Sequence, residues 1–352
     1  MSTYPLAEDR QPAVAWDGRR LGEVLETAAA EFSRHAEEIN RINVFPVPDG
    51  DSGTNMERTL AAVARAAQQA AAAGAGAGEL MRQAARAALL GARGNSGVIL
   101  AEIFRGMSRR LEQLATLRPR DMAEALAAGA EAAYKAVVEP VEGTILTAIR
   151  AAAEATARFR QEPAGGMAEL LRTAAEAARE ATLRSPELLP VLRERGVVDA
   201  AAKGLAIFLE AAAAQASRIE AEGRAGWQEA GASPAEEPLA GDGAGATVQG
   251  TPAARAPRAP FYGQEVQLLL FTTLPEGEVR SRLEPLGGSL LVIGEPGLYR
   301  VHIHTRRTAE VLESCRAMGR TDQETVEDLD EEAARAEAGS HLRGDEPGGG
   351  AS

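Results

Sequence analysis

Apolar residues recur at three- and four-residue spacing through the first two thirds of the chain. This spacing places side chains on one face of a helix, and the first such stripe comprises Leu21, Val24, Leu25, Ala28, Phe32 and Ile39. Similar segments cover residues 55–72, 79–90, 97–114, 121–138, 144–161, 167–184 and 198–216, with a short piece at 187–194. Breaks that contain Gly or Pro separate them. We therefore predict a helical domain over residues 15–217, with eight or nine helices in an antiparallel bundle or barrel.

The pattern changes after residue 217. Residues 218–260 are rich in Ala, Gly, Pro, Glu and Arg, which predicts a disordered linker. Residues 261–330 are predicted to form strands at 266–271, 290–293, 299–304 and 324–329, and helices at 276–286 and 309–318. The order βαββαβ predicts a small α+β domain. The tail, 331–352, is charged and then Gly-rich, and is predicted to be disordered.

The loop at residues 43–56 carries the strongest chemical signal. Its sequence is NVFPVPDGDSGTNM, in which Asp49 and Asp51 stand two residues apart just before a predicted helix. Mg²⁺ takes carboxylate oxygens together with substrate phosphates, and a helix N-terminus offers free N–H groups to an anion. The loop therefore suits a metal–nucleotide site. The alternative is a solvated turn before a helix, because Asp-Gly is a common turn dipeptide.

A second loop, residues 91–97, breaks the helical pattern with the sequence GARGNSG. Its glycines permit close approach of a ligand, and Asn95 and Ser96 can bind a phosphate oxygen or cap the following helix. Arg93 could neutralise a γ-phosphate or be a surface arginine. The loop matches neither the Walker pattern nor the dinucleotide fingerprint. The alternative interpretation is that it is an ordinary connection between two helices.

The composition excludes several classes of protein. A net charge of −13 argues against a nucleic-acid-binding body, and 45% apolar residues allow a real core. Cys315 is the single cysteine, which rules out an intramolecular disulfide and fits a reducing compartment. No apolar run is long enough for a membrane span, and residues 1–10 lack a signal-peptide pattern, so we expect a cytoplasmic protein.

Four motifs, at residues 43–56, 91–100, 141–147 and 195–200, together resemble the FakA-type fatty acid kinases. This family is the DegV-associated relative of the dihydroxyacetone kinases and their DhaL nucleotide-binding domain. Residues 261–305 look like the middle domain of the same family. The resemblance implies an eight-helix antiparallel DhaL-like barrel that binds ATP through two Mg²⁺ ions. It also implies transfer of the γ-phosphate to a fatty acid carboxylate presented by a separate DegV-type protein, giving an acyl phosphate for phospholipid synthesis.

The resemblance and the residue types together assign roles within the site. Catalytic roles fall on Asp49, Asp51 and Arg93, and Mg²⁺ ligation on Asn43, Asp49 and Asp51. The predicted nucleotide contacts are Gly53, Thr54, Asn55, Gly94, Asn95, Ser96, Thr144 and Asp199. A fatty acid carboxylate is already ionised at pH 7 and needs no general base, which agrees with the absence of histidine from residues 41–217.

The chain departs from the family pattern in three places. Ala201 and Ala202 replace two glycines, and Gly263 stands where the family has a cysteine that joins two histidines on a metal. The chain also ends at residue 352, so we expect the short form without the family's large C-terminal domain. His302 and His304 share one side of a predicted strand, but two imidazoles alone make half of a closed zinc site, and zinc is not expected there.

Two other functions remain open at this point. One is a small-metabolite kinase of the dihydroxyacetone kinase type, and the other is a nucleotide-binding regulator without catalysis. The resemblance also suggests a homodimer, although no interface can be assigned from the sequence. Nucleic acid is not expected among the partners.

Overall fold

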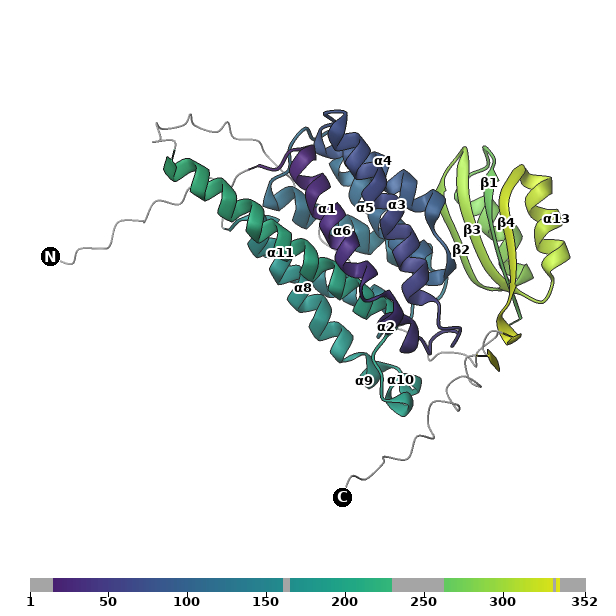
Figure 1. The fold of residues 1–352 in the computed structure, drawn as a ribbon. Helices are drawn as coiled ribbons and strands as arrows, with labels where there is room; N and C mark the ends of the chain where they lie inside the picture. Colours follow the sequence, from purple (N-terminus) through teal and green to yellow (C-terminus); the bar gives the residue numbers. More distant parts are fainter. Residues whose placement is uncertain (1–14, 161–164, 230–262, 332–333, 336–352) are drawn as a thin grey trace, which may run out of the picture.

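The computed structural model describes residues 15–160, 165–229, 263–331 and 334–335. Its helical part contains eight main helices, which contact one another in chain order, and the last of them returns to the first, so they close into a barrel (Figure 1). They are α1 (Gly18–Ser33), α3 (Ser52–Ala72), α4 (Ala77–Gly91), α5 (Gly94–Leu111), α6 (Pro119–Ala136), α7 (Ile145–Ala155), α8 (Met167–Leu183) and α11 (Ala200–Glu229). Shorter pieces are α2 (Ala36–Arg41), η1 (Ala157–Arg160), α9 (Ser185–Leu188) and α10 (Pro190–Arg195). The predicted eight-helix barrel is confirmed.

Small side chains allow the barrel helices to pack closely. Ala28, Ala84 and Ala148 are completely buried in the core. An added Cβ on Gly53 would collide with the carbonyl oxygen of Ala36. This packing explains how a chain that is 4% aromatic forms a continuous core.

The first predicted helix is wrong in one respect, because its apolar stripe continues across two helices. The N–H groups of Arg34 and His35 donate to the carbonyls of Glu31 and Phe32, three residues back. These bonds tighten the turn and end α1, and the chain resumes as α2, whose Ile39 is buried in the same core.

The last barrel helix is longer than predicted. α11 ends at Glu229, so residues 218–229, predicted as the start of the linker, are helical. The segment is rich in good helix formers, and Ile219 still packs in the core. In the predicted tail, residues 331, 334 and 335 are helical. Residues 230–260 and the rest of the tail lie outside the described residues, and the division into domains stays a prediction.

The C-terminal unit is a four-stranded antiparallel sheet with strand order β2-β3-β1-β4. Its elements are β1 (Gln264–Phe271), α12 (Glu276–Leu283), η2 (Glu284–Leu286), β2 (Gly288–Glu295), β3 (Leu298–Thr305), α13 (Thr308–Met318) and β4 (Arg320–Asp328), in the predicted βαββαβ order. One face of the sheet packs on the two helices through Leu268, Val301, Val279 and Val311. This unit therefore has a small core of its own.

The opposite face of the sheet docks on the barrel, so that the sheet lies between the barrel and α13 (Figure 1). Leu291 and Ile293 belong to the barrel core. Arg300, fully buried on β3, donates from Nε to the carbonyl of Leu89 at 3.2 Å and from Nη2 to that of Leu90 at 2.6 Å. These carbonyls end α4, where backbone acceptors lack helical partners. Burial lowers the pKa of Arg300 to about 9.

We expect Arg300→Met to loosen this docking. The substitution keeps the side-chain volume but leaves the α4 carbonyls without donors, and hydrogen bonds to charged groups are worth roughly 1.5–3 kcal/mol each. Chemical denaturation should show a loss of about 2–4 kcal/mol, and amide hydrogen exchange should rise in residues 91–97 and 264–271. Arg316→Met is the matched control, because Arg316 is exposed and pairs with Glu324. Equal stability and exchange in both variants would contradict the docking role.

Candidate functional site

The four sequence motifs meet at one end of the barrel. Ser96, at the start of α5, donates to the carbonyl of Ser52 at 3.4 Å, which joins the second loop to the first. Lys203 on α11 pairs with Glu38 on α2, next to the first loop. The backbone N–H of Asp199 donates to the hydroxyl of Ser185 at 2.9 Å, and an added Cβ on Gly143 would touch Leu189. The starts of α3, α5, α7 and α11 therefore surround one region.

The two aspartates of the first loop lie among amide groups. Asn43 donates its amide to Asp49 Oδ1, which also accepts the N–H of Asp51 at 3.3 Å. Asn55 donates to Asp51 Oδ2 at 2.6 Å. The Oδ1 oxygen of Asn43 is buried and has no donor. Two carboxylates beside an amide oxygen without a donor form a site that fits a hard cation.

The surroundings of this aspartate pair disfavour ionisation of both carboxyl groups. Burial, followed by the neighbouring Asp51 carboxylate, raises the pKa of Asp49 to about 9. Burial and then the Glu265 carboxylate raise the pKa of Asp51. The pair therefore retains a proton at neutral pH unless a cation replaces it.

The start of α5 contacts both the first loop of the barrel and the sheet. Gly94 has φ of +56°, and an added Cβ would collide with Asn55. Its N–H donates to Gln267 Oε1 on β1 at 3.2 Å. The Asn95 amide lies 3.4 Å from His304 Nε2, and Arg93 donates to its neighbour's backbone carbonyl and, at 3.4 Å, to Gln323 on β4. The loop predicted to bind phosphate is thus in contact with the sheet.

Other predicted nucleotide contacts serve local structure. Thr54 exchanges hydrogen bonds with the side chain of Asn40. Thr144 caps α7 by accepting the N–H of Leu146 at 3.3 Å. Asp199 accepts the N–H of Ala202 at 2.8 Å in the first turn of α11, and burial raises its pKa to about 7. The assignment of these residues, and of Gly53, to the nucleotide stays a prediction.

Sequence reasoning missed two polar side chains of the sheet, Glu265 and Gln267. Glu265 is buried on the docking face with His302 and His304, and one ligand atom from each of these three lies within 4.8 Å of the others. Burial lowers the pKa of His302 to about 4, so its imidazole is neutral at pH 7. Glu265 and Gln267 alternate with apolar residues in β1, and two polar side chains on one face of a buried strand are the signal that could have revealed them.

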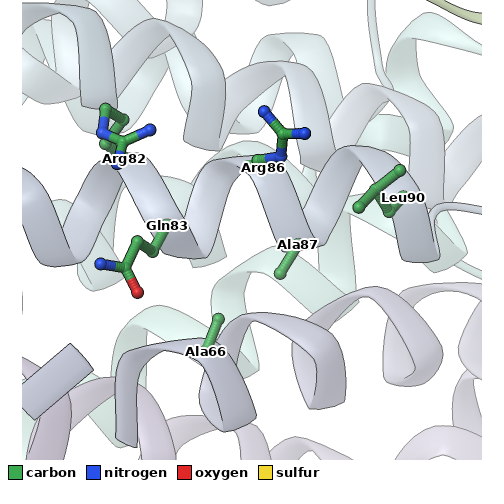
Figure 2. Close-up of a pocket in the computed structure, with 6 residues that line it drawn as sticks. All are labelled: Ala66, Arg82, Gln83, Arg86, Ala87 and Leu90. Atoms are coloured by element: carbon green, nitrogen blue, oxygen red, sulfur yellow. The ribbon is translucent and has the colours of Figure 1, made fainter. Parts of the chain in front are cut away.

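Two hollows lie on the barrel. One, between α3 and α4, contains none of the predicted site residues (Figure 2) and is lined by Ala66, Arg82, Gln83, Arg86, Ala87 and Leu90. The other, of about 440 Å³, lies beside the loop that leads to Asp199, where Val197 and Val198 contribute to its wall. Of these two, the second is at the end where the four motifs meet.

Two family models match parts of this chain. Residues 46–214 match the DAK2 domain, and residues 262–336 match the FakA-like middle domain of fatty acid kinases. Uncharacterized protein SSP1546 of Staphylococcus saprophyticus is 34% identical over 332 residues, and protein YloV of Bacillus subtilis is 35% identical over 319 residues. Each alignment covers 90% of this chain and 56% of the relative, so the chain spans just over half the length of these relatives.

Among solved structures, the dihydroxyacetone kinase from C. freundii in complex with AMP-PNP and Mg²⁺ aligns with a TM-score of 0.41 and 20% identity. That alignment covers 60% of this chain and 37% of the kinase chain. Within the described ranges, no helix has the length and apolar content that a bilayer crossing requires.

We expect Mg²⁺ to stabilise the protein more at pH 8.5 than at pH 6. The raised pKa of Asp49 means that the folded state binds a proton more tightly than the unfolded state. This contribution to stability is complete below the ordinary carboxyl pKa and is lost as the pH rises towards about 9. Mg²⁺ must displace that proton, so its affinity grows over the same range.

Thermal denaturation with and without Mg²⁺ at the two pH values measures this effect. Asp49→Asn should remove most of the Mg²⁺ stabilisation and its pH dependence, whereas Asp322→Asn, an exposed change on β4, should leave both intact. An equal increase in melting temperature at both pH values would rule out a shared proton at the ion site.

We also expect Thr144→Ala to destabilise the protein by about 1 kcal/mol through loss of the α7 cap, and Thr144→Ser to restore it. Denaturation curves give the stability, and nucleotide titration gives the affinity. A loss of nucleotide affinity without a loss of stability would instead support the predicted pocket contact.

Proposed function

We propose that this chain, in which residues 46–214 match the DAK2 domain and residues 262–336 match a FakA-like middle domain, is the ATP- and Mg²⁺-dependent component of a kinase. Its acceptor is the carboxylate of a fatty acid, presented by a DegV-type binding protein in the cytoplasm, and its product is an acyl phosphate.

The observation that supports the proposal most directly is the buried Oδ1 of Asn43, which has no donor beside the Asp49–Asp51 pair. Oxygen ligands of this kind suit Mg²⁺, which usually keeps several waters and shares substrate phosphates with one or two carboxylates. Asn43, Asp49 and Asp51 would hold the ions, which supply charge neutralisation for phosphoryl transfer when bound.

The remaining residues of the site position the phosphates. Asn95 and Ser96 stand at the N-terminus of α5, where backbone N–H groups and the helix dipole favour an anion. Arg93 now donates to Gln323, so its predicted contact with the γ-phosphate requires it to leave β4. The acceptor carboxylate is ionised at pH 7, and the site therefore needs no group that removes a proton from it.

A reconstituted assay tests the proposal. The chain is mixed with ATP, Mg²⁺, a fatty acid and a folded DegV-type protein, and both ADP and acyl phosphate are measured. We expect Asp49→Asn and Asp51→Asn to lower transfer by about a hundredfold or more, because each removes charge that holds the metal and phosphates. Circular dichroism should show unchanged helix content, and Asp322→Asn should retain transfer.

Two outcomes would replace the proposal with its alternatives. Release of ADP with dihydroxyacetone alone, without a partner protein, would identify a small-metabolite kinase. ATP binding without turnover under either acceptor would identify a nucleotide-binding regulator.

A further inference from the structure

Two arginines from different parts of the chain share one acceptor at the edge of the sheet. Gln323 Oε1 on β4 accepts a hydrogen bond from Arg300 Nη2 at 3.1 Å and another from Arg93 Nη2 at 3.4 Å. Arg93 is the residue just before α5, and Arg300 lies on β3. An amide oxygen has two lone pairs and can accept both bonds, whereas the amide nitrogen could only face the guanidiniums as another donor. Gln323 therefore bridges the barrel and the sheet.

A β-bulge places Gln323 at this point. Between two pairs of the ladder, β1 advances from Gln267 to Leu269 while β4 runs from Thr325 back to Asp322, so β4 contains one extra residue there. Gln323 lies within this bulge and has φ of +51°, in the left-handed region that favours glycine. Bulges redirect side chains, and a strained residue persists only where the surrounding structure holds it. The bulge thus gives Gln323 a direction that a regular strand would not give it.

The two arginines are held to different degrees. Arg300 is completely buried and also donates to two backbone carbonyls at the end of α4. Arg93 is only partly buried, and its other hydrogen bond goes to the carbonyl of Ala92, its neighbour in the chain. Gln323 itself is exposed. Arg300 can therefore keep Gln323 in place while Arg93 leaves, without any separation of the sheet from the barrel.

The charge of Arg93 is met by uncharged acceptors. Within the described residues, its hydrogen bonds go to two neutral oxygens, those of Ala92 and Gln323. Burial, followed by the charge of Arg58 on α3, lowers the pKa of Arg93, and the Glu327 carboxylate opposes this shift without reversing it. An anionic oxygen attracts a guanidinium through its charge as well as through a hydrogen bond, and more strongly in a partly buried site than in water. A phosphate at the start of α5 would therefore draw Arg93 away from Gln323.

We propose that Gln323 is a positioning residue, which holds Arg93 on β4 before ATP binds and releases it to the γ-phosphate when ATP binds. This inference rests on the proposed function, which assigns Arg93 to that phosphate. Gln323 acts through Arg93. A neutral amide suits this role, because a carboxylate at the same place would pair with both arginines and compete with the phosphate. A side chain without an acceptor would leave Arg93 free.

Two substitutions of Gln323 should change ATP binding in opposite directions. The affinity of the full chain for ATP and for ADP, each with Mg²⁺, is measured by titration calorimetry. We expect Gln323→Glu to weaken ATP binding by about fivefold or more, and Gln323→Ala to strengthen it by about threefold, because no bond to β4 then has to break. ADP, which lacks the γ-phosphate, should show neither change. Gln69→Glu is the matched control, because it adds the same charge at an exposed glutamine of α3, and it should leave ATP affinity unchanged.

An arginine variant separates this contact from general charge repulsion. Arg93→Met should weaken ATP binding, and in that background Gln323→Glu and Gln323→Ala should bind ATP equally well, since the residue through which they act is gone. If Gln323→Ala folds poorly, Gln323→Gly makes the same test, because glycine suits a φ of +51°.

The outcomes distinguish this inference from the proposed function. Equal ATP affinities of the two Gln323 variants, or a difference that persists with ADP or in the Arg93→Met background, would overturn the inference and leave the kinase reaction untouched. A difference that depends on Arg93, in a chain that transfers no phosphate, would support the inference and reject the proposed reaction. Failure of the unmodified chain to bind ATP would reject both.

Discussion

The junction between α4 and α5 is the constraint on which both parts of the molecule depend. A helix end leaves backbone carbonyls or N–H groups without helical partners. Here Arg300 covers the last carbonyls of α4, and Gln267 accepts the first N–H of α5. Both side chains come from the sheet. The guanidinium of Arg300 is itself buried, and a buried charge without partners is strongly unfavourable. The sheet therefore supplies hydrogen-bond partners to the helix ends of the barrel, and the barrel supplies acceptors to the buried guanidinium of the sheet. These paired polar groups fix the orientation of the sheet on the barrel, in addition to the apolar contacts.

This junction also fixes the candidate site. Residues 91–94 lie between the sheet and the first loop, and the close approach of Gly94 to Asn55 leaves no room for a larger side chain. Asn55 in turn holds Asp51, and Ser96 reaches the carbonyl of Ser52. The start of α5 and the aspartate pair consequently form one connected unit. A shift of the sheet would move the start of α5, which is predicted to bind phosphate, relative to the aspartates, even though no residue of the sheet belongs to the predicted nucleotide contacts.

Local patterns predicted the order of the main helices and strands and located the two loops, because periodicity and turn residues act over a few positions. The helices α1 and α2 were merged because the break at His35 contains neither Gly nor Pro. The roles of Glu265, Gln267 and Arg300 could not be predicted, because they depend on the register of β1 with β3 and on docking between segments more than 150 residues apart in sequence. Thr144 was predicted to contact the nucleotide because its motif resembled a family signature, and the structure shows that it caps α7. A motif alone does not separate these two roles.

The electrostatics of the junction link ion binding to docking. Asp51 lies close enough to Glu265 for that carboxylate to raise its pKa, after burial has done so. Docking therefore brings like charges from the barrel and the sheet towards each other, a cost that a cation bound by the aspartate pair would reduce. An ion that binds the docked form better than the separated form stabilises docking, by about 2.7 kcal/mol at a hundred times its dissociation constant if it binds only the docked form. Linkage is reciprocal, so docking must strengthen the binding of such an ion by the same free energy. The aspartate pair on the barrel and Glu265 on the sheet are for that reason best considered as one coupled system.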